Sequence, residues 1–141
     1  MLDTILTEKS LYCENHQIQL TYMADGTRLS FISDTDLYAM PGNLLDNAIE
    51  SVLELDEPEK RSIRLTISMA GNMLIIHTEN YYHHPVKMEN GLPVTTKKDT
   101  RYHGFGMKSL QLLATRYGST LAVDADDEIF NVNIMLPLPP V

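Results

Sequence analysis

The spacing of apolar residues in the N-terminal part of the chain changes from a helical period to a strand period. Apolar positions at helical spacing predict a short helix over residues 2–14. The segment IQLTYMA, residues 18–24, alternates at Ile18, Leu20 and Tyr22 and predicts a strand. Asp25-Gly26 follows as a strong two-residue hairpin signal. We therefore expect RLSFIS, residues 28–33, to return as the partner strand.

A longer amphipathic helix is predicted over residues 35–55, capped by Asp34. Pro41 inside it predicts a kink, or a first short turn followed by a new helix with Pro41 near its start. After Pro41 one face of the helix is apolar. The opposite stripe holds only carboxylates and amides, which are Asn43, Asp46, Asn47, Glu50 and Glu54.

This polar stripe is a candidate cation site. An exposed helix face usually places lysines four residues from its acids, and this stripe contains none. Carboxylate and amide oxygens suit Mg²⁺, which takes oxygen ligands and keeps several waters. A solvated acidic face is an equally ordinary alternative, and we expect Glu54 to belong to it.

Two further strand pairs are expected in the C-terminal half. SIRLTISM (residues 62–69) and MLIIHTEN (residues 73–80) alternate and predict the first pair. TLAVD (residues 120–124) and the alternating residues 130–136, with a turn at Asp126-Asp127, predict the second. Because the strands come as hairpins rather than as βαβ units, we expect an α+β sandwich of two layers. Its mixed or mostly antiparallel sheet would carry helices on one face.

A long segment without periodicity, residues 81–103, precedes a glycine-rich helix start. A loop of this length in a compact domain is commonly a functional lid. Gly104 and Gly106 let the backbone approach a phosphate, and the free N–H groups of a helix N-terminus bind anions. Lys108 in the first turn opposes the helix dipole, which a bound anion would explain. Many of the chain's lysines and arginines cluster in and beside this segment.

Composition and charge exclude several classes of protein. The 141 residues correspond to about one domain, which we take as residues 1–141. The formal charge of −8 argues against general nucleic-acid binding and against docking on anionic lipid. The lone Cys13 excludes an internal disulfide. No apolar run reaches the ~20 residues of a membrane span, and the N-terminus lacks a signal-peptide pattern, so a cytoplasmic chain without direct membrane contact is expected.

Asn80 and the histidines are weaker signals. Asn80 ends an apolar strand and could pair with adenine through its amide, although a strand-end asparagine is usually a turn residue. His83, His84 and His103 do not have the spacing of a structural zinc site. No histidine lies in a recognisable nucleophile motif, so hydrolase chemistry is unsupported.

Three segments, in this order and spacing, closely resemble the ATP-binding catalytic domain of sensor histidine kinases. They are GNLLDNAIES (residues 42–51), the strand that ends at Asn80, and TTKKDTRYHGFGMKSLQLLATRYG (residues 95–118). That domain belongs to the GHKL ATPase superfamily, with gyrase, MutL and the heat-shock chaperone. The likeness covers essentially the whole chain. It is best to the quorum-sensing peptide-receptor kinases of Gram-positive bacteria, which share the NLLDNAIE-type box and an STKKD…HGxGL lid end.

The resemblance implies the Bergerat α/β sandwich, ATP and Mg²⁺ as ligands, and a lid at about residues 81–103. It implies transfer of the γ-phosphoryl group to a histidine on a separate dimerisation domain, with a response regulator as the next partner. No histidine of this chain lies in a helical phosphoacceptor pattern, so autophosphorylation by the chain alone is not expected. We expect a monomer that forms the cytoplasmic part of a membrane receptor, because the dimer interface would lie in the absent domain.

The resemblance also implies roles for single residues. Asn47 would be the Mg²⁺ ligand, and Asn43, one turn earlier, would contact phosphate or the waters of the metal. Asn80 stands where most relatives have the aspartate that recognises adenine. Lys97 of the lid would contact phosphate and, with Asn43, complete the catalytic set. The nucleotide-binding segment around the second glycine box comprises His103, Gly104, Phe105, Gly106, Met107 and Lys108.

Three departures from the family pattern concern the nucleotide. The first glycine box, usually DxGxG, is NYYHH from Asn80 onward, without a glycine, and the subfamily shares this loss. A neutral asparagine is a less strict reader of adenine than an aspartate, and Tyr81 or Tyr82 could stack on the base instead. Met107 replaces a leucine, which is a mild exchange. Pro41 closely precedes Asn43 and could tilt that end of the helix.

Two other functions stay open on the sequence alone. One is a stand-alone GHKL kinase that phosphorylates a protein serine, as anti-sigma factors do, which the subfamily pattern disfavours. The other is a non-catalytic nucleotide-sensing domain, which the loss of the first glycine box would favour.

Overall fold

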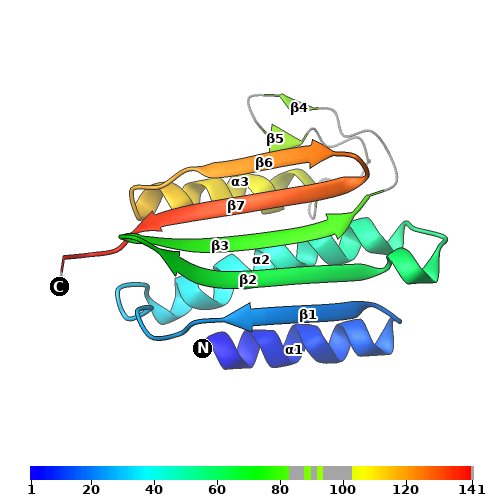
Figure 1. Cartoon of the computed structure of the whole chain (residues 1–141), viewed down its shortest axis with the longest axis horizontal. Coiled ribbons are helices and arrows are strands. Elements are labelled where there is room, and N and C mark those ends of the chain that lie inside the picture. The colour runs from blue at the N-terminus through cyan, green and yellow to red at the C-terminus, as the bar shows by residue number, and fades with distance from the viewer. Residues whose placement is uncertain (83–87, 90–91, 94–102, 141) are drawn as a thin grey trace.

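The computed structural model of the chain describes residues 1–82, 88–89, 92–93 and 103–140. Figure 1 shows the arrangement of the elements. In chain order they are α1 (Leu2–Asn15), β1 (Gln19–Ala24), α2 (Asp34–Leu53), the 3-10 turn η1 (Pro58–Lys60), β2 (Ser62–Ala70), β3 (Met73–Tyr81), β4 (Met88–Glu89), β5 (Leu92–Pro93), α3 (His103–Arg116), β6 (Leu121–Asp126) and β7 (Ile129–Pro137). Among the described residues, no helix combines the length and the hydrophobicity that crossing a lipid bilayer requires.

Five strands form one mixed sheet in the order β1-β2-β3-β7-β6. β1 is parallel to β2, and the other neighbouring strands are antiparallel. α2 and α3 pack side by side against one face of the sheet, and α1 packs beside α2 along β1 (Figure 1). The expected α+β fold of two layers with a mixed sheet is confirmed.

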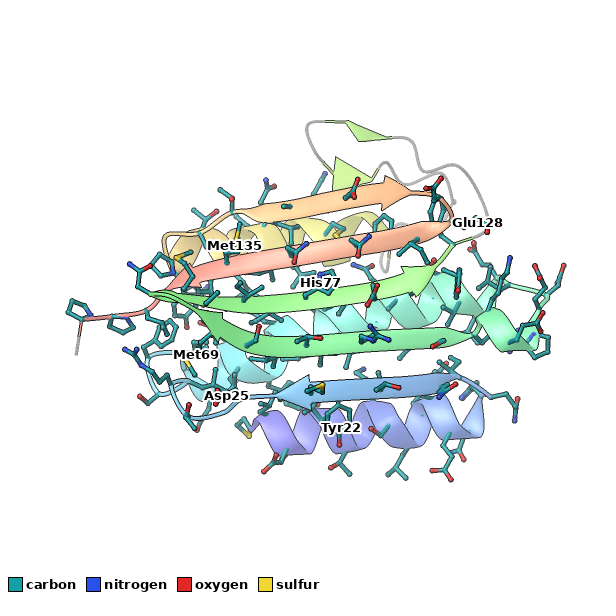
Figure 2. The ribbon with its side chains drawn as sticks, in the orientation of Figure 1. Tyr22, Asp25, Met69, His77, Glu128 and Met135 are labelled. Atoms are coloured by element: carbon teal, nitrogen blue, oxygen red, sulfur yellow. The ribbon has the colours of Figure 1, made fainter. Side chains whose placement is uncertain are left out.

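Alternating residues of the strands bury one face of the sheet under the helices. The inward positions of β2 and β3 are apolar up to the last two of β3, which are Thr78 and Asn80. The opposite sheet face carries polar pairs: His77 shares a hydrogen bond of 2.8 Å with Asn133, and Arg64 lies 3.2 Å from Glu79. Figure 2 shows His77 on this uncovered face. The core therefore lies wholly between sheet and helices, and two buried polar groups mark its edge at the end of β3.

The expected hairpin at Asp25-Gly26 is wrong. Residues 28–33 form no strand, and β1 pairs only with β2, in a register that joins Leu20 to Ile63. The Asp25 carboxylate instead accepts hydrogen bonds from the N–H and the hydroxyl of Thr27, at 3.1 and 2.7 Å, which closes a local turn. The chain then inserts Leu29 into the core and enters α2. β1, α2 and β2 thus form the kind of parallel crossover that the sequence pattern had disfavoured.

The start of α2 also differs from the prediction. Ser33, and not Asp34, is the N-cap, because its side chain accepts a hydrogen bond of 3.2 Å from the N–H of Asp36. The helix then continues through Pro41, so no new helix begins there. Pro41 is buried, and packing on the sheet outweighs the loss of one backbone hydrogen bond. Asp36 and Asn47 consequently belong to one continuous helix.

Two other segments refine the predictions. The turn of the terminal hairpin is formed by Asp127 and Glu128, one residue later than expected, and both have positive φ angles of 47° and 69°. Glu128 stands at the tip of this hairpin beside the end of β3 (Figure 2), where its carbonyl accepts the N–H of Tyr82 at 2.9 Å. The segment expected to lack structure contains the short antiparallel pair of β4 and β5.

A buried carboxylate joins the first turn of α2 to the C-terminal end of α3. Asp36 is only 3% exposed. Its two oxygens accept hydrogen bonds from Arg116 at 2.8 and 3.0 Å, and the Tyr117 hydroxyl donates to it at 2.5 Å. The N–H of Ser33 donates in turn to the Tyr117 oxygen at 3.2 Å. We call Ser33, Asp36, Arg116 and Tyr117 the Asp36 clamp.

The Asp36 clamp predicts acid sensitivity of the fold. The Tyr117 hydroxyl, with Arg116 and Ser33, holds the pKa of Asp36 below its ordinary value against the opposing effect of burial. A lowered folded-state pKa contributes stability that is complete above the unfolded-state value of about 3.9 and is lost as the pH falls below it through the folded-state pKa. Asp36→Asn should therefore lower the free energy of unfolding by about 2 kcal/mol at pH 7, measured by urea denaturation.

The difference between wild type and Asp36→Asn should shrink as the pH falls below about 4. Asp124→Asn, on an exposed strand position, serves as the matched control and should change the stability little. A difference that stays constant from pH 7 to pH 3 would show that the ionised form of Asp36 is not what joins the helices.

Candidate functional site

The edge of α2 that faces α3 carries the candidate ligands. The Asp36 clamp identifies this edge, because Asp36 contacts residues at the end of α3. Asn43 lies two helical turns after Asp36, and Asn47 one turn later, so all three share that edge. Asn43 and Asn47 are half-buried. The helix therefore presents two amides beside α3.

Asn47 carries an unpartnered buried polar atom. Within the residues that the structure describes, its Nδ2 is the only buried side-chain nitrogen or oxygen without a hydrogen-bond partner. A buried unpaired amide group costs about 1–3 kcal/mol, and such groups are rare in native proteins. A ligand that offers a hydrogen-bond acceptor in front of α2 would give Nδ2 a partner. The residues present therefore fit a bound ligand at this position.

The opposite edge of α2 belongs to α1. Lys9 of α1 donates a hydrogen bond of 2.5 Å to Asp46, and Tyr38 donates one of 2.6 Å to Glu8. A methyl group added at Gly42 would lie 3.1 Å from Ile5 of α1, so the two helices approach closely there. The polar stripe is thus not without cations, contrary to the sequence pattern, because its lysine comes from another helix. Glu50 and Glu54 also interact with other groups.

The glycine-rich segment forms the start of α3, as predicted. The helix begins at His103, so Gly104, Phe105 and Gly106 lie in its first turn. The first N–H groups of a helix have no partner within it and can bind an anion. Met107 is 3% exposed and packs in the core, so only its backbone is available, whereas the side chain of Lys108 is exposed.

The antiparallel pairing brings the start of α3 toward Asn47. Asp36 meets Arg116, and the two helices pack together. Asn47 comes after Asp36 in α2, and Phe105 comes before Arg116 in α3, by the same number of residues. In each helix this separation is a rise of about 16 Å. The Asn47 amide and the glycine-rich turn therefore lie at corresponding levels of the pair, away from the Asp36 clamp.

Asn80 closes the site at the end of β3. It is 4% exposed, and its Nδ2 donates a hydrogen bond of 2.7 Å to the carbonyl of Tyr81. Alternation along β3 puts it on the face that packs against α2, with Thr78 one inward position earlier. Thr78 is 2% exposed and was not predicted as a site residue. Its spacing of two residues from Asn80 is the only signal in the sequence.

The structure separates the two tyrosines that follow Asn80. Phe130 pairs with Asn80 in the sheet register and shares its face, and the Tyr82 ring meets Phe130 edge-on at 6.2 Å. Alternation directs Tyr81 away from Asn80; its side chain packs partly against the core, and Lys60 lies 5.8 Å from the centre of its ring. Tyr82 is therefore the tyrosine on the side of Asn80.

Other predicted residues lie outside the part that the structure describes. These are Lys97, His83 and His84, and the side chains of His103 and Phe105. In the described part of the chain, no group of three or more His, Cys, Asp and Glu side chains could hold a metal ion. An Mg²⁺ ion at Asn47 would take its remaining ligands from phosphates and water, as this ion commonly does.

A family model described as the GHKL domain matches residues 32–137. No curated protein sequence matches the chain. Among solved structures, a nucleotide-free catalytic domain of histidine kinase ThkA superposes with a TM-score of 0.70 at 15% identity, over 99% of this chain and 92% of that one. The Acinetobacter baumannii histidine kinase AdeS gives a TM-score of 0.59 at 11% identity, over 98% of this chain and 65% of that one. At these identities the likeness is one of fold.

Proposed function

The chain belongs to the GHKL domain family, and from this membership we propose that it is the ATP-binding catalytic domain of a two-component sensor histidine kinase. A GHKL ATPase domain binds ATP, and the fold is that of histidine kinase catalytic domains. The observation that carries the proposal for this site is the buried, unpartnered amide of Asn47 on the edge of α2 beside α3.

Each part of the site has a proposed task toward Mg-ATP. Asn47 would bind the Mg²⁺ ion through its amide oxygen, with its Nδ2 group donating to a phosphate oxygen, and Asn43 would bind a phosphate or a water of the metal. The backbone N–H groups at the start of α3 would bind the phosphates, with Lys97 and Lys108 as cations nearby. Bound Mg-ATP would supply the γ-phosphoryl group, and the Mg²⁺ ion would neutralise part of the phosphate charge. Asp46 is held by Lys9, so we assign it no role as a base.

The base would bind at the end of β3. With Nδ2 of Asn80 donating to the backbone, the amide oxygen is the atom that this side chain can offer to the amino group of adenine. Tyr82 and Phe130 would form an aromatic wall on the same side, in place of the missing first glycine box. Tyr82 is preferred to Tyr81 because it shares the face of Asn80.

The acceptor would be a histidine on a separate dimerisation domain, with a response regulator as the next partner. We further propose that residues 1–141 form one unit with a lid at about residues 81–103, that this unit is monomeric and cytoplasmic, and that it belongs to the quorum-sensing subfamily. The subfamily rests on the NLLDNAIE and TKKD segments of the sequence.

Mg-ATP should raise the thermal unfolding midpoint by several degrees. At ~100 times its dissociation constant, a ligand adds about 2.7 kcal/mol to the free energy of unfolding. Asn47→Ala should abolish this shift. Because Nδ2 has no partner to lose, the ligand-free variant should stay within about 1 kcal/mol of wild type. Asn131→Ala, on the uncovered sheet face, is the matched control and should keep the shift.

Three results of this measurement would contradict the proposal. If millimolar Mg-ATP leaves the unfolding midpoint of wild type unchanged, the chain does not bind the nucleotide, and a domain that acts through protein contacts is favoured. A shift that Asn47→Ala retains in full would remove Asn47 from the metal site. An equal loss in Asn131→Ala would mean that the effect is not local to the site.

The chemistry of transfer separates the proposed kinase from a serine kinase. With labelled ATP and a histidine-containing dimerisation domain of the same system, the chain should label that domain, and acid should remove the label. A phosphorylated serine withstands the same acid treatment. Asn47→Ala should lower the rate at least about a hundredfold if it positions the metal. Label on the acceptor that survives acid would contradict transfer to histidine.

A further inference from the structure

The helices that carry the two halves of the proposed nucleotide site are joined to each other at the opposite end. Asn43 and Asn47 lie on α2, and the glycine-rich turn begins α3. The Asp36 clamp ties the start of α2 to the end of α3. A pair of helices fixed at one end transmits a change at that end along its length.

We propose that the Asp36 clamp positions the start of α3 relative to Asn47 and thereby sets the affinity for Mg-ATP. This inference rests on the proposed function. The residues of the Asp36 clamp touch no part of the nucleotide site, because about 16 Å of helix separates Asp36 from Asn47. Asp36 and Tyr117 would therefore act as positioning residues.

The hydrogen bonds of the Asp36 clamp are well suited to hold a single geometry. The carboxylate is almost fully buried and receives donors from two consecutive residues, Arg116 and Tyr117. Both Arg116 hydrogen bonds come from Nη1, and with the Tyr117 hydroxyl they hold both oxygens of the carboxylate in place. The Tyr117 ring also packs edge-on against Phe31, with ring centres 6.1 Å apart. The end of α3 is thus held by these directed polar contacts together with its apolar residues in the core, which include Leu113 and Ala114.

α3 buries Met107 and Leu110 in the core, but in the described part of the chain it packs on one helix only, whereas α2 lies between two, so α3 is the helix that would tilt. On its other edge α2 is held to α1 by Lys9 and Glu8. Its apolar face, including Leu44 and Leu45, is fully buried in the core. A tilt of a few degrees at the Asp36 clamp would move the far end of α3 by about 1 Å over a rise of about 16 Å. Misplacement of that size can cost an enzyme about a hundredfold in rate, and we expect a smaller effect on the binding of Mg-ATP.

Tyr117→Phe tests the proposal, because it removes one hydroxyl and keeps the ring on Phe31. Tyr38→Phe is the matched control: it removes a hydroxyl that donates to a carboxylate at almost the same distance, 2.6 against 2.5 Å, but on the α1 edge of α2. Isothermal titration should show that Tyr117→Phe raises the dissociation constant of Mg-ATP by roughly tenfold, while Tyr38→Phe changes it less than about twofold.

Hydrogen exchange without nucleotide gives a second readout of the effect of the Asp36 clamp on α3. In Tyr117→Phe, the amides of Met107–Leu110, about two turns from the Asp36 clamp, should exchange several times faster than in wild type and in Tyr38→Phe. A local structural role would speed exchange only near Tyr117. Where Tyr117→Phe does not fold, Arg116→Gln removes the other donor and should change both readouts in the same direction.

The outcomes distinguish this inference from the proposed function. Wild-type affinity and unchanged exchange at Met107–Leu110 in Tyr117→Phe would overturn the role of the Asp36 clamp and leave the nucleotide site intact. Equal effects of Tyr117→Phe and Tyr38→Phe would also overturn it. Failure of wild type to bind Mg-ATP would overturn the proposed function, and the exchange measurement would still decide whether the Asp36 clamp controls the start of α3.

Discussion

The antiparallel packing of α2 against α3 on one face of the sheet is the constraint on which the candidate site depends. Neither helix alone presents more than a few polar groups. Packed together, they place the amide of Asn47 near the level of the free N–H groups at the start of α3. The buried carboxylate of Asp36 fixes this pairing at the other end. We propose that, in this member of the GHKL domain family, the two halves of the site depend on this distant ion pair.

The two edges of α2 have different tasks. Its α1 edge holds Asp46, which Lys9 neutralises, and its α3 edge holds the amides of Asn43 and Asn47. This division matters electrostatically, because a free carboxylate facing bound phosphates would repel them. The pairing with Lys9 ties Asp46 to α1, while the amides of Asn43 and Asn47 lie beside α3, with Glu50 one turn after Asn47.

Local periodicity predicted the elements well where one face of each is buried. The alternation of β2 and β3 and the stripe of α2 after Pro41 depend on burial of one face, which a short window of sequence reveals. Three features depend on contacts distant in the chain and were missed. The partner of β1 is β2, the partner of Asp36 is at the end of α3, and the lysine beside Asp46 comes from α1. Local rules at Asp25-Gly26 and Pro41 were outweighed by packing of Leu29 and by burial of the proline.

The sequence predicted which residues belong to the candidate site, but not how their side chains are buried and partnered. Spacing and family resemblance name Asn43, Asn47, Asn80 and the glycine-rich turn, and these assignments remain proposals. Only the structure reveals that Nδ2 of Asn47 is buried without a partner and that the Tyr82 ring meets Phe130, the register partner of Asn80. Titration of ¹⁵N-labelled protein with Mg-ATP tests the account most directly. We expect the amide resonances of Asn43, Asn47, the start of α3, Asn80 and Tyr82 to shift. Those of Asn131 and Asn133 on the uncovered sheet face should keep their positions. Shifts centred on that uncovered face, or none, would contradict the account.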